Sequence, residues 1–189
     1  MSHEQYRGFV GIVLALLGIG LATPPILQMI YGEAKANVVF QTSDQPDGHF
    51  LNCVVTNPPI TAGFLYSCGV RRTAIQDLFI SYTIKEEGTG KIIVSDISSD
   101  IIIGSGMASR RAHLPASPVG AVALIIGTLK AGDGMGIAKI CNHDYTNVPV
   151  GHYVAIVGIS VDGKRTVMER RFDVLTQYPY VKWVNPQAV

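Results

Sequence analysis

The sequence predicts an all-β fold, built as an antiparallel β-sandwich, with one transmembrane helix on its N-terminal side. Three observations support this prediction. Residues 8–32 contain no charged side chain. From residue 37 onward, short runs of strand-forming residues alternate with clusters of Gly, Pro, Asn and Asp, which is typical of a β domain. Asp162-Gly163 separates two such runs, and this dipeptide favours a two-residue hairpin turn.

The first residues predict a short tail, residues 1–7, followed by a transmembrane anchor over residues 8–32. The uncharged run has 25 residues, which exceeds the roughly 20 residues needed to span a bilayer core. Two prolines follow Thr23 and predict a kink near residues 20–22. A secretory signal peptide cleaved after Ala22 is the alternative. The uncleaved anchor is favoured, because residues 1–7 carry no excess positive charge and the apolar run continues beyond the prolines.

Four small residues recur in this segment at spacings of four, three and four residues. They are Gly11, Ala15, Gly18 and Ala22. These spacings place them on one face of a helix, and small residues allow membrane helices to pack closely. We therefore interpret them as helix-packing residues that contact other membrane-complex subunits. The alternative is that Gly and Ala are simply frequent in membrane helices.

Charges at the two ends of the apolar run bear on orientation. Arg7 precedes the run, and Glu33 and Lys35 follow it. Positive charge favours the cytoplasmic side of a membrane. We expect a single-pass membrane protein in contact with the lipid bilayer, with its β-domain on the periplasmic or extracellular side. The charge bias is small, so the opposite orientation stays open.

The β-domain is expected to cover residues 37–175 in about eight strands. Leu78–Lys85 is the clearest strand, because alternate residues are apolar at the period of a half-buried strand. The other expected strands are Asn37–Thr42, Phe50–Thr56, Lys91–Ile97, Val119–Leu129, Met135–Cys141, His152–Val161 and Lys164–Leu175. Short strands at regular spacing indicate a sandwich rather than a parallel sheet.

The last expected hairpin resembles part of a known superfamily. Residues 148–153 and the hairpin that follows them resemble the last two strands of immunoglobulin-like and fibronectin-type sandwiches, including bacterial adhesion-type modules. The resemblance implies an immunoglobulin-like antiparallel β-sandwich in which Tyr153 is a tyrosine-corner residue. The antibody-type Cys…Trp…Cys set is absent. Ala155 occupies the position of the second Cys, and the only tryptophan is Trp183.

The composition argues against several classes of function. A net charge of +1 is too small for a nucleic-acid-binding protein, so no nucleic acid is expected as a partner. The cysteines, Cys53, Cys68 and Cys141, are too few for a disulfide framework, and their pairing stays open. No histidine pair has the spacing of a zinc site. Cys141, His143 and His152 would suggest copper only with a nearby Met, which the loop lacks.

The sequence contains no catalytic, cofactor-binding or metal-binding motif, so we expect neither an enzyme nor a cofactor. A Gly-x-Ser-x-Gly nucleophile elbow is absent, and residues 104–106 lack the Lys-Ser/Thr of a phosphate-binding loop. Three arginine pairs, at 71–72, 110–111 and 170–171, could meet lipid phosphates or an acidic partner. The favoured alternative for these arginines is a solvated surface or local ion pairs.

Residues 176–189 form an aromatic tail beyond the last expected strand. Tyr178, Tyr180 and Trp183 lie within six positions of one another. Aromatic residues are enriched at interface hot spots, so these three are candidate partner-interface residues. An equal alternative is that the tail folds back and covers an open edge or the core end of the domain.

Together these patterns favour a non-catalytic, membrane-anchored accessory or structural subunit of a larger membrane protein complex. Helix packing and contacts of the β-domain would hold it in place, and an energy-transducing complex of a bacterial membrane is the first host we expect. The alternative is an exported, free-standing binding or adhesion module released by signal-peptide cleavage. A metal or redox protein is the third hypothesis. A fold does not fix a function, so these hypotheses are separated by sites and partners.

Overall fold

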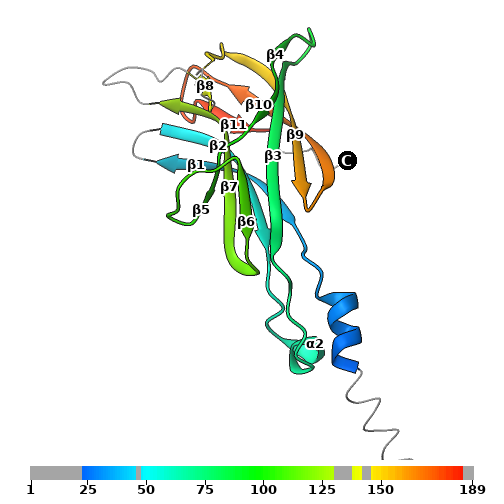
Figure 1. Cartoon of the computed structure of the whole chain (residues 1–189). Helices are drawn as coiled ribbons and strands as arrows, with labels where there is room; N and C mark the ends of the chain where they lie inside the picture. The colour runs from blue at the N-terminus through cyan, green and yellow to red at the C-terminus, as the bar shows by residue number, and fades with distance from the viewer. Residues whose placement is uncertain (1–22, 46–47, 130–137, 142–145, 185–189) are drawn as a thin grey trace, which may run out of the picture.

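The computed structural model describes residues 23–45, 48–129, 138–141 and 146–184. The chain forms two antiparallel sheets packed into a sandwich, with helical structure at one end (Figure 1). The all-β antiparallel sandwich predicted from the sequence is therefore confirmed. The helical structure consists of a segment at residues 23–31 and the short helix α2 (Gly63–Ser67).

One sheet has five strands in the order β1-β2-β7-β5, and β8 also pairs with β7. Its strands are β1 (Asn37–Gln45), β2 (Gly48–Asn57), β5 (Ile101–Ile103), β7 (Ser117–Leu129) and β8 (Ala138–Ile140). β5 pairs with residues 121–123 of β7, and β8 pairs with residues 126–128. Two short strands therefore share one edge of this sheet, an arrangement that limits edge-to-edge pairing with other chains.

The other sheet has six strands in the order β11-β10-β9-β3-β4, and β6 also pairs with β3. Its strands are β3 (Ile75–Glu86), β4 (Ile92–Ser98), β6 (Arg111–Leu114), β9 (Gly151–Val161), β10 (Lys164–Val174) and β11 (Val181–Trp183). The two hairpins predicted from the sequence, β3–β4 and β9–β10, are both present. The long strands β3 and β9 lie next to each other at the centre of the sheet.

The hydrophobic core lies between the sheets and is built from alternate residues of the long strands. Leu78, Ile80, Tyr82 and Ile84 of β3 are all buried, which confirms the period-two pattern of this strand. The facing strand β2 contributes its own buried set in the same way: Leu51, Cys53 and Val55. Burial of each large apolar side chain stabilises the fold by about 1.5–3 kcal/mol.

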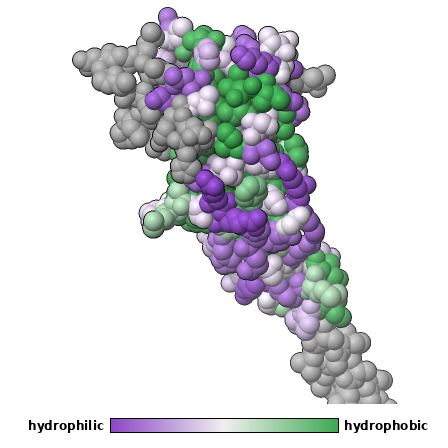
Figure 2. Space-filling model, turned by 45° about the horizontal axis from the view of Figure 1, so that its top comes forward, coloured by the Kyte–Doolittle hydropathy of each residue, from purple (hydrophilic) through white to green (hydrophobic). Residues whose placement is uncertain are grey.

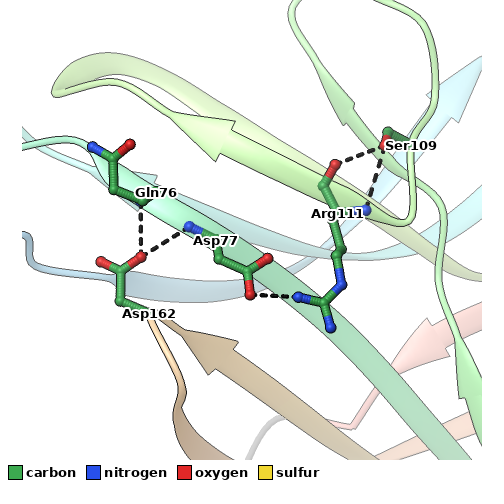
Figure 3. Close-up of polar contacts among 5 residues, drawn as sticks. All are labelled: Gln76, Asp77, Ser109, Arg111 and Asp162. Carbon is green, nitrogen blue, oxygen red and sulfur yellow. Dashed lines mark hydrogen bonds and ion pairs between the residues drawn. The ribbon is translucent and has the colours of Figure 1, made fainter.

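The turn between β9 and β10 is also bonded to the start of β3 (Figure 3). Asp162 and Gly163 have φ values of 49° and 82°, as a two-residue hairpin turn requires. Asp162 Oδ1 accepts hydrogen bonds from the backbone N–H groups of Gln76 and Asp77, both at 2.8 Å. The Arg111 guanidinium contacts Asp77 Oδ2 at 2.6 Å and so links β6 to the same place. The Asp162-Gly163 turn therefore positions the first residues of β3 as well as reversing the chain.

Tyr153, near the start of β9, makes the hydrogen bond expected of a tyrosine corner. Its hydroxyl donates to the carbonyl oxygen of Pro149, four residues earlier, at 2.9 Å. Its buried ring stacks on Phe172 with the ring centroids 5.4 Å apart. Burial, and secondarily the charge of Glu86, raises the pKa of Tyr153 above its ordinary value. The hydroxyl therefore stays protonated at neutral pH and can act as the donor.

Four short elements were not predicted from the sequence: α2, β5, β6 and β11. Each has three to five residues, which is too short for a periodic pattern to be recognised. β11 changes the picture of the aromatic tail, because residues 181–183 add a strand to the sheet beside β10. The last strand expected from the sequence, Lys164–Leu175, ends before this element. Of the strand expected over residues 135–141, the structure describes only β8 and Cys141.

Within the described ranges, no helix has the length and apolar character that a membrane span needs. The predicted anchor over residues 8–32 falls mostly outside these ranges, as do the tail of residues 1–7 and the expected kink near residues 20–22. The four candidate helix-packing residues also lie outside them: Gly11, Ala15, Gly18 and Ala22. The part of the anchor that is described, residues 23–31, is helical.

Candidate functional site

Two regions of the molecule carry the side chains that could serve a function. We name the first the helical end; it comprises residues 23–36, α2 and residues 70–73. The second is the aromatic tail, of which residues 176–184 are described. Figure 1 shows the helical segment and α2 together at one end of the sandwich, below the start of β3.

The helical segment is hydrogen-bonded to the chain that follows α2. The side chain of Gln28 makes two bonds with the backbone of Arg71: its Oε1 accepts from the N–H at 2.8 Å, and its Nε2 donates to the carbonyl at 2.7 Å. One turn later, the carbonyl of Gly32 accepts a hydrogen bond from the backbone N–H of Thr73 at 2.7 Å. The segment therefore has a defined position against the domain.

A buried asparagine joins this region to the sandwich. Asn57, the last residue of β2, accepts a hydrogen bond from the backbone N–H of Lys35 at 3.1 Å through Oδ1. Its Nδ2 donates to the carbonyl of Thr73 at 2.9 Å and, at a longer 3.5 Å, to that of Leu114. One side chain thus connects the approach to β1, the approach to β3 and the end of β6.

Arg72 strengthens the same junction from the surface. Its guanidinium donates to the carbonyl of Glu33 and to the carbonyl of Pro58, both at 2.8 Å. Glu33 also pairs with Lys164 at 3.0 Å, and both side chains are well exposed, so this ion pair adds little to stability. Arg72, the second residue of the arginine pair at 71–72, therefore makes hydrogen bonds to backbone carbonyls within the chain.

Apolar side chains at the helical end are exposed. None of the five residues of α2 is buried, and Phe64 is 70% exposed. The helical segment exposes a further set of large side chains: Ile26, Met29, Ile30 and Tyr31. Figure 2 shows apolar surface at the lower end of the coloured part of the molecule, separated by hydrophilic surface from the apolar surface higher up. Exposed apolar side chains gathered at one end of a molecule are a candidate site of contact with a membrane or a partner.

The aromatic tail folds back over the open edge between the two sheets. The indole ring of Trp183 packs edge-on against Phe40 of β1 and Phe172 of β10, with centroids 5.2 Å and 5.8 Å away. Its N–H donates to the carbonyl of Gln41 at 3.1 Å. Because β1 and β11 belong to different sheets, Trp183 links the two layers of the sandwich.

The two tyrosines of the tail gather around a buried histidine. Tyr178 and Tyr180 pack on the ring of His49, with centroids 4.9 Å and 5.7 Å away. Asp44 connects the group, since Oδ1 lies 2.5 Å from His49 Nδ1 and Oδ2 accepts from the Tyr178 hydroxyl at 3.1 Å. This hydrogen bond raises the pKa of Tyr178, so the hydroxyl stays protonated at neutral pH.

The structure thus brings Tyr178 and Tyr180 together and places Trp183 separately, at the open edge. These contacts correspond to the fold-back alternative for the aromatic tail. Tyr178 is 65% exposed, whereas Tyr180 and Trp183 are more buried and only partly accessible to solvent. The role of the three residues at an interface with a partner stays a prediction.

The described titratable groups offer little nucleophilic or metal-binding capacity. The cysteines are free, and burial raises the pKa of the Cys53 and Cys141 thiols to about 12. Because the thiolate is the nucleophile and the metal ligand, both groups are unreactive thiols at neutral pH. In the described part of the chain, no three His, Cys, Asp or Glu side chains gather to hold a metal ion. His152 pairs instead with Asp173 at 2.8 Å, and His143 lies outside the described residues.

Sequence reasoning missed α2 and the partners of the two tyrosines. The available indication for α2 was an apolar run of three residues, Phe64 to Tyr66, outside any expected strand. His49 and Asp44 carry no comparable indication, because they meet Tyr178 only in the folded chain; Asp44 and Tyr178 are 134 positions apart in the sequence.

Comparison of the chain with protein-family models, with curated proteins and with solved structures found no match. The function is therefore inferred from the chemistry and geometry of the chain itself.

Proposed function

We propose that this chain is a non-catalytic, membrane-anchored accessory subunit of a larger membrane protein complex. The observation that carries the proposal is the junction at the helical end. The uncharged run of residues 8–32 leads into a helical segment that is hydrogen-bonded to the domain through Gln28 and Gly32. A rigid junction of this kind transmits the position of an anchor to the domain that it carries.

The same region disfavours the exported, free-standing module. Cleavage after Ala22 would leave the helical segment at the new N-terminus, with its large apolar side chains exposed to water. Exposed apolar surface of this kind promotes aggregation of a soluble protein. In a membrane-anchored chain the same side chains continue the apolar run that precedes them.

We also propose that the sandwich is of the immunoglobulin-like type. The order β1-β2-β7-β5 corresponds to A-B-E-D in that superfamily, and β10-β9-β3-β4 corresponds to G-F-C-C′. The hydrogen bond from Tyr153 to Pro149 lies at the start of the strand that corresponds to F, where a tyrosine corner belongs. Sandwiches of this type often serve as binding or scaffold modules, which suits an accessory subunit.

The direction of the pKa shifts argues against an activated nucleophile among the described thiols and phenols whose pKa is shifted. Five described groups have clearly shifted pKa values, and all are shifted upward: Cys53, Tyr82, Cys141, Tyr153 and Tyr178. An upward shift keeps a thiol or a phenol neutral at pH 7, whereas an activated nucleophile of these types needs a lowered pKa. These groups are therefore suited to packing and hydrogen bonding.

The proposal is tested by isolating the chain from native membranes in a mild detergent and analysing it by mass spectrometry. We expect an intact N-terminus and other membrane proteins in fixed proportion to the chain. A chain that starts at Thr23 and travels alone would contradict the proposal and support an exported module.

The helix-packing residues provide a second test within the same preparation. Gly18→Leu is expected to reduce co-purification of the partner subunits, because a large side chain prevents close helix approach. Gly20→Leu is the matched control, since Gly20 lies about half a helical turn away from the face formed by Gly11, Ala15, Gly18 and Ala22. Equal co-purification of both variants with the wild-type yield would count against this face.

A further inference from the structure

Helix α2 has a composition and an exposure that the sandwich does not explain. Its sequence is Gly-Phe-Leu-Tyr-Ser, and none of these residues is buried. Phe64 and Tyr66 are both exposed, and the Arg71 guanidinium lies over the ring of Tyr66, 4.2 Å from its centroid. A helix of five residues has little stability of its own in water, and only Leu65 among its residues is even partly buried.

The position of α2 relative to the helical segment is fixed. Arg71 makes the contact on both sides: its guanidinium donates to the carbonyl of Tyr66 at 3.1 Å, and its backbone is held by Gln28. Gln28 lies three residues before Tyr31 and four before Gly32, which is about one helical turn. The helical segment and α2 are therefore held side by side at this end of the molecule (Figure 1).

We propose that α2 lies in the headgroup layer of the lipid bilayer, as a second membrane contact beside the anchor. The inference rests on the proposed membrane anchorage. If residues 8–32 span the bilayer, the end of the apolar run, near Tyr31, marks the interface, and Gln28 holds Arg71 within about 5 Å of that level. Phe64 and Tyr66 are then at the depth where aromatic side chains are favoured.

The charge at the helical end fits a phospholipid surface. Residues 23–36 and 58–73 contain three basic side chains, Lys35, Arg71 and Arg72, and one acidic side chain, Glu33. Basic residues next to a membrane segment are attracted to lipid phosphates. Arg71 is exposed, and its guanidinium lies over the ring of Tyr66, so it can reach a phosphate while the aromatic rings of α2 enter the apolar layer below.

A single tryptophan placed in α2 tests the proposal in the full-length chain. The chain has one native tryptophan, Trp183, which lies in β11 of the sandwich and provides the baseline. The Phe64→Trp variant is reconstituted into phospholipid vesicles whose acyl chains carry bromine near the headgroups or near the bilayer centre. Phe64 is exposed, so the substitution should leave the fold intact.

A matched control is available at the end of the β3–β4 hairpin that lies away from the helical end. Ile92 is exposed at the start of β4 and pairs with Lys85, near the end of β3. The 12 residues of β3 separate it from the helical end by roughly 40 Å. Ile92→Trp therefore adds a tryptophan at another exposed position, well away from the expected membrane surface.

We expect bromine near the headgroups to quench the added emission of Phe64→Trp more strongly than bromine near the bilayer centre. Wild-type protein and Ile92→Trp should show no quenching. If bromine quenches the added emission of Phe64→Trp no more than that of Ile92→Trp, in chains that stay in the vesicles after an alkaline wash, the inference is overturned and the anchor stays in place. Loss of the chain from the vesicles during that wash would overturn both the inference and the anchorage.

Discussion

The helical end and the sandwich treat their apolar side chains in opposite ways. In the sandwich, alternate residues of β3 and β2 are buried between two sheets, and burial stabilises the fold. At the helical end, polar contacts through Gln28, Asn57 and Arg72 hold the chain in position while the large apolar side chains face outward. Because polar contacts hold the helical end in position, we expect its exposed apolar side chains to contribute little to the stability of the domain and to be available for contact with another surface.

The largest expected effect comes from the buried side of this comparison. Ile80→Ala removes a fully buried side chain from the centre of β3 and leaves a cavity. We expect the free energy of unfolding to fall by about 4 kcal/mol, because the surrounding core relaxes only partly. Urea unfolding followed by circular dichroism measures it. A loss below about 1 kcal/mol would mean that the core is less closely packed than the burial of β3 indicates.

The junction between the helical end and the sandwich should weaken when the buried side-chain amide of Asn57 is removed. Asn57→Ala leaves the Lys35 N–H and the Thr73 carbonyl without their partner, at an expected loss of about 2 kcal/mol. Hydrogen exchange should accelerate at residues 32–35 and 70–73. Gln76→Ala, an exposed change near the same end of the sheet, serves as the control. Unchanged exchange in Asn57→Ala would show that the bonds made by Gln28, Gly32 and Arg72 maintain the junction without Asn57.

The open edge of the sandwich offers an intermediate case. Trp183→Ala removes the ring that lies against Phe40 and Phe172, and also the hydrogen bond to Gln41. We expect a loss of about 2 kcal/mol, less than for a fully buried tryptophan, because the ring is only half-buried. Tyr178→Ala, at a more exposed position, should cost less. A larger loss for Tyr178→Ala than for Trp183→Ala would mean that the tail stabilises the domain mainly through the contacts around His49.

The smallest effect is expected at α2. Phe64→Ala should change the free energy of unfolding by no more than about 0.5 kcal/mol, because the side chain is exposed and the helix contributes no buried residue. The same unfolding measurement as for Ile80→Ala applies. A decrease in the free energy of unfolding of more than about 1 kcal/mol would contradict this expectation, because α2 would then help to stabilise the domain.

Much of the sandwich followed from local patterns. Alternation in β3 and the Asp162-Gly163 turn each depend on neighbouring residues, so the sequence was sufficient to predict the strand and the hairpin. The hydrogen bond from Tyr153 to Pro149, which the resemblance to immunoglobulin-like sandwiches implied, joins residues only four positions apart. Features of this kind can be recognised without knowing how distant segments meet.

The parts that escaped prediction depend on contacts between distant residues. β11 has three residues, and it is a strand only because β10 lies beside it. The pairing of Gln28 with Arg71 spans 43 positions and has no local signature. Periodicity cannot report such contacts, so the junction at the helical end could not be predicted. The fold-back of the aromatic tail could be stated only as one of two equal alternatives.

The link between Trp183 and Gln41 also has a consequence for the order of events during synthesis. These residues are 142 positions apart, and the contact between Tyr178 and Asp44 spans 134. β1 therefore emerges from the ribosome long before the segment that covers its edge exists. Contacts between such distant positions form slowly, because a long loop must close first. The open edge of the sandwich is therefore covered only after residues 178–183 have been synthesised.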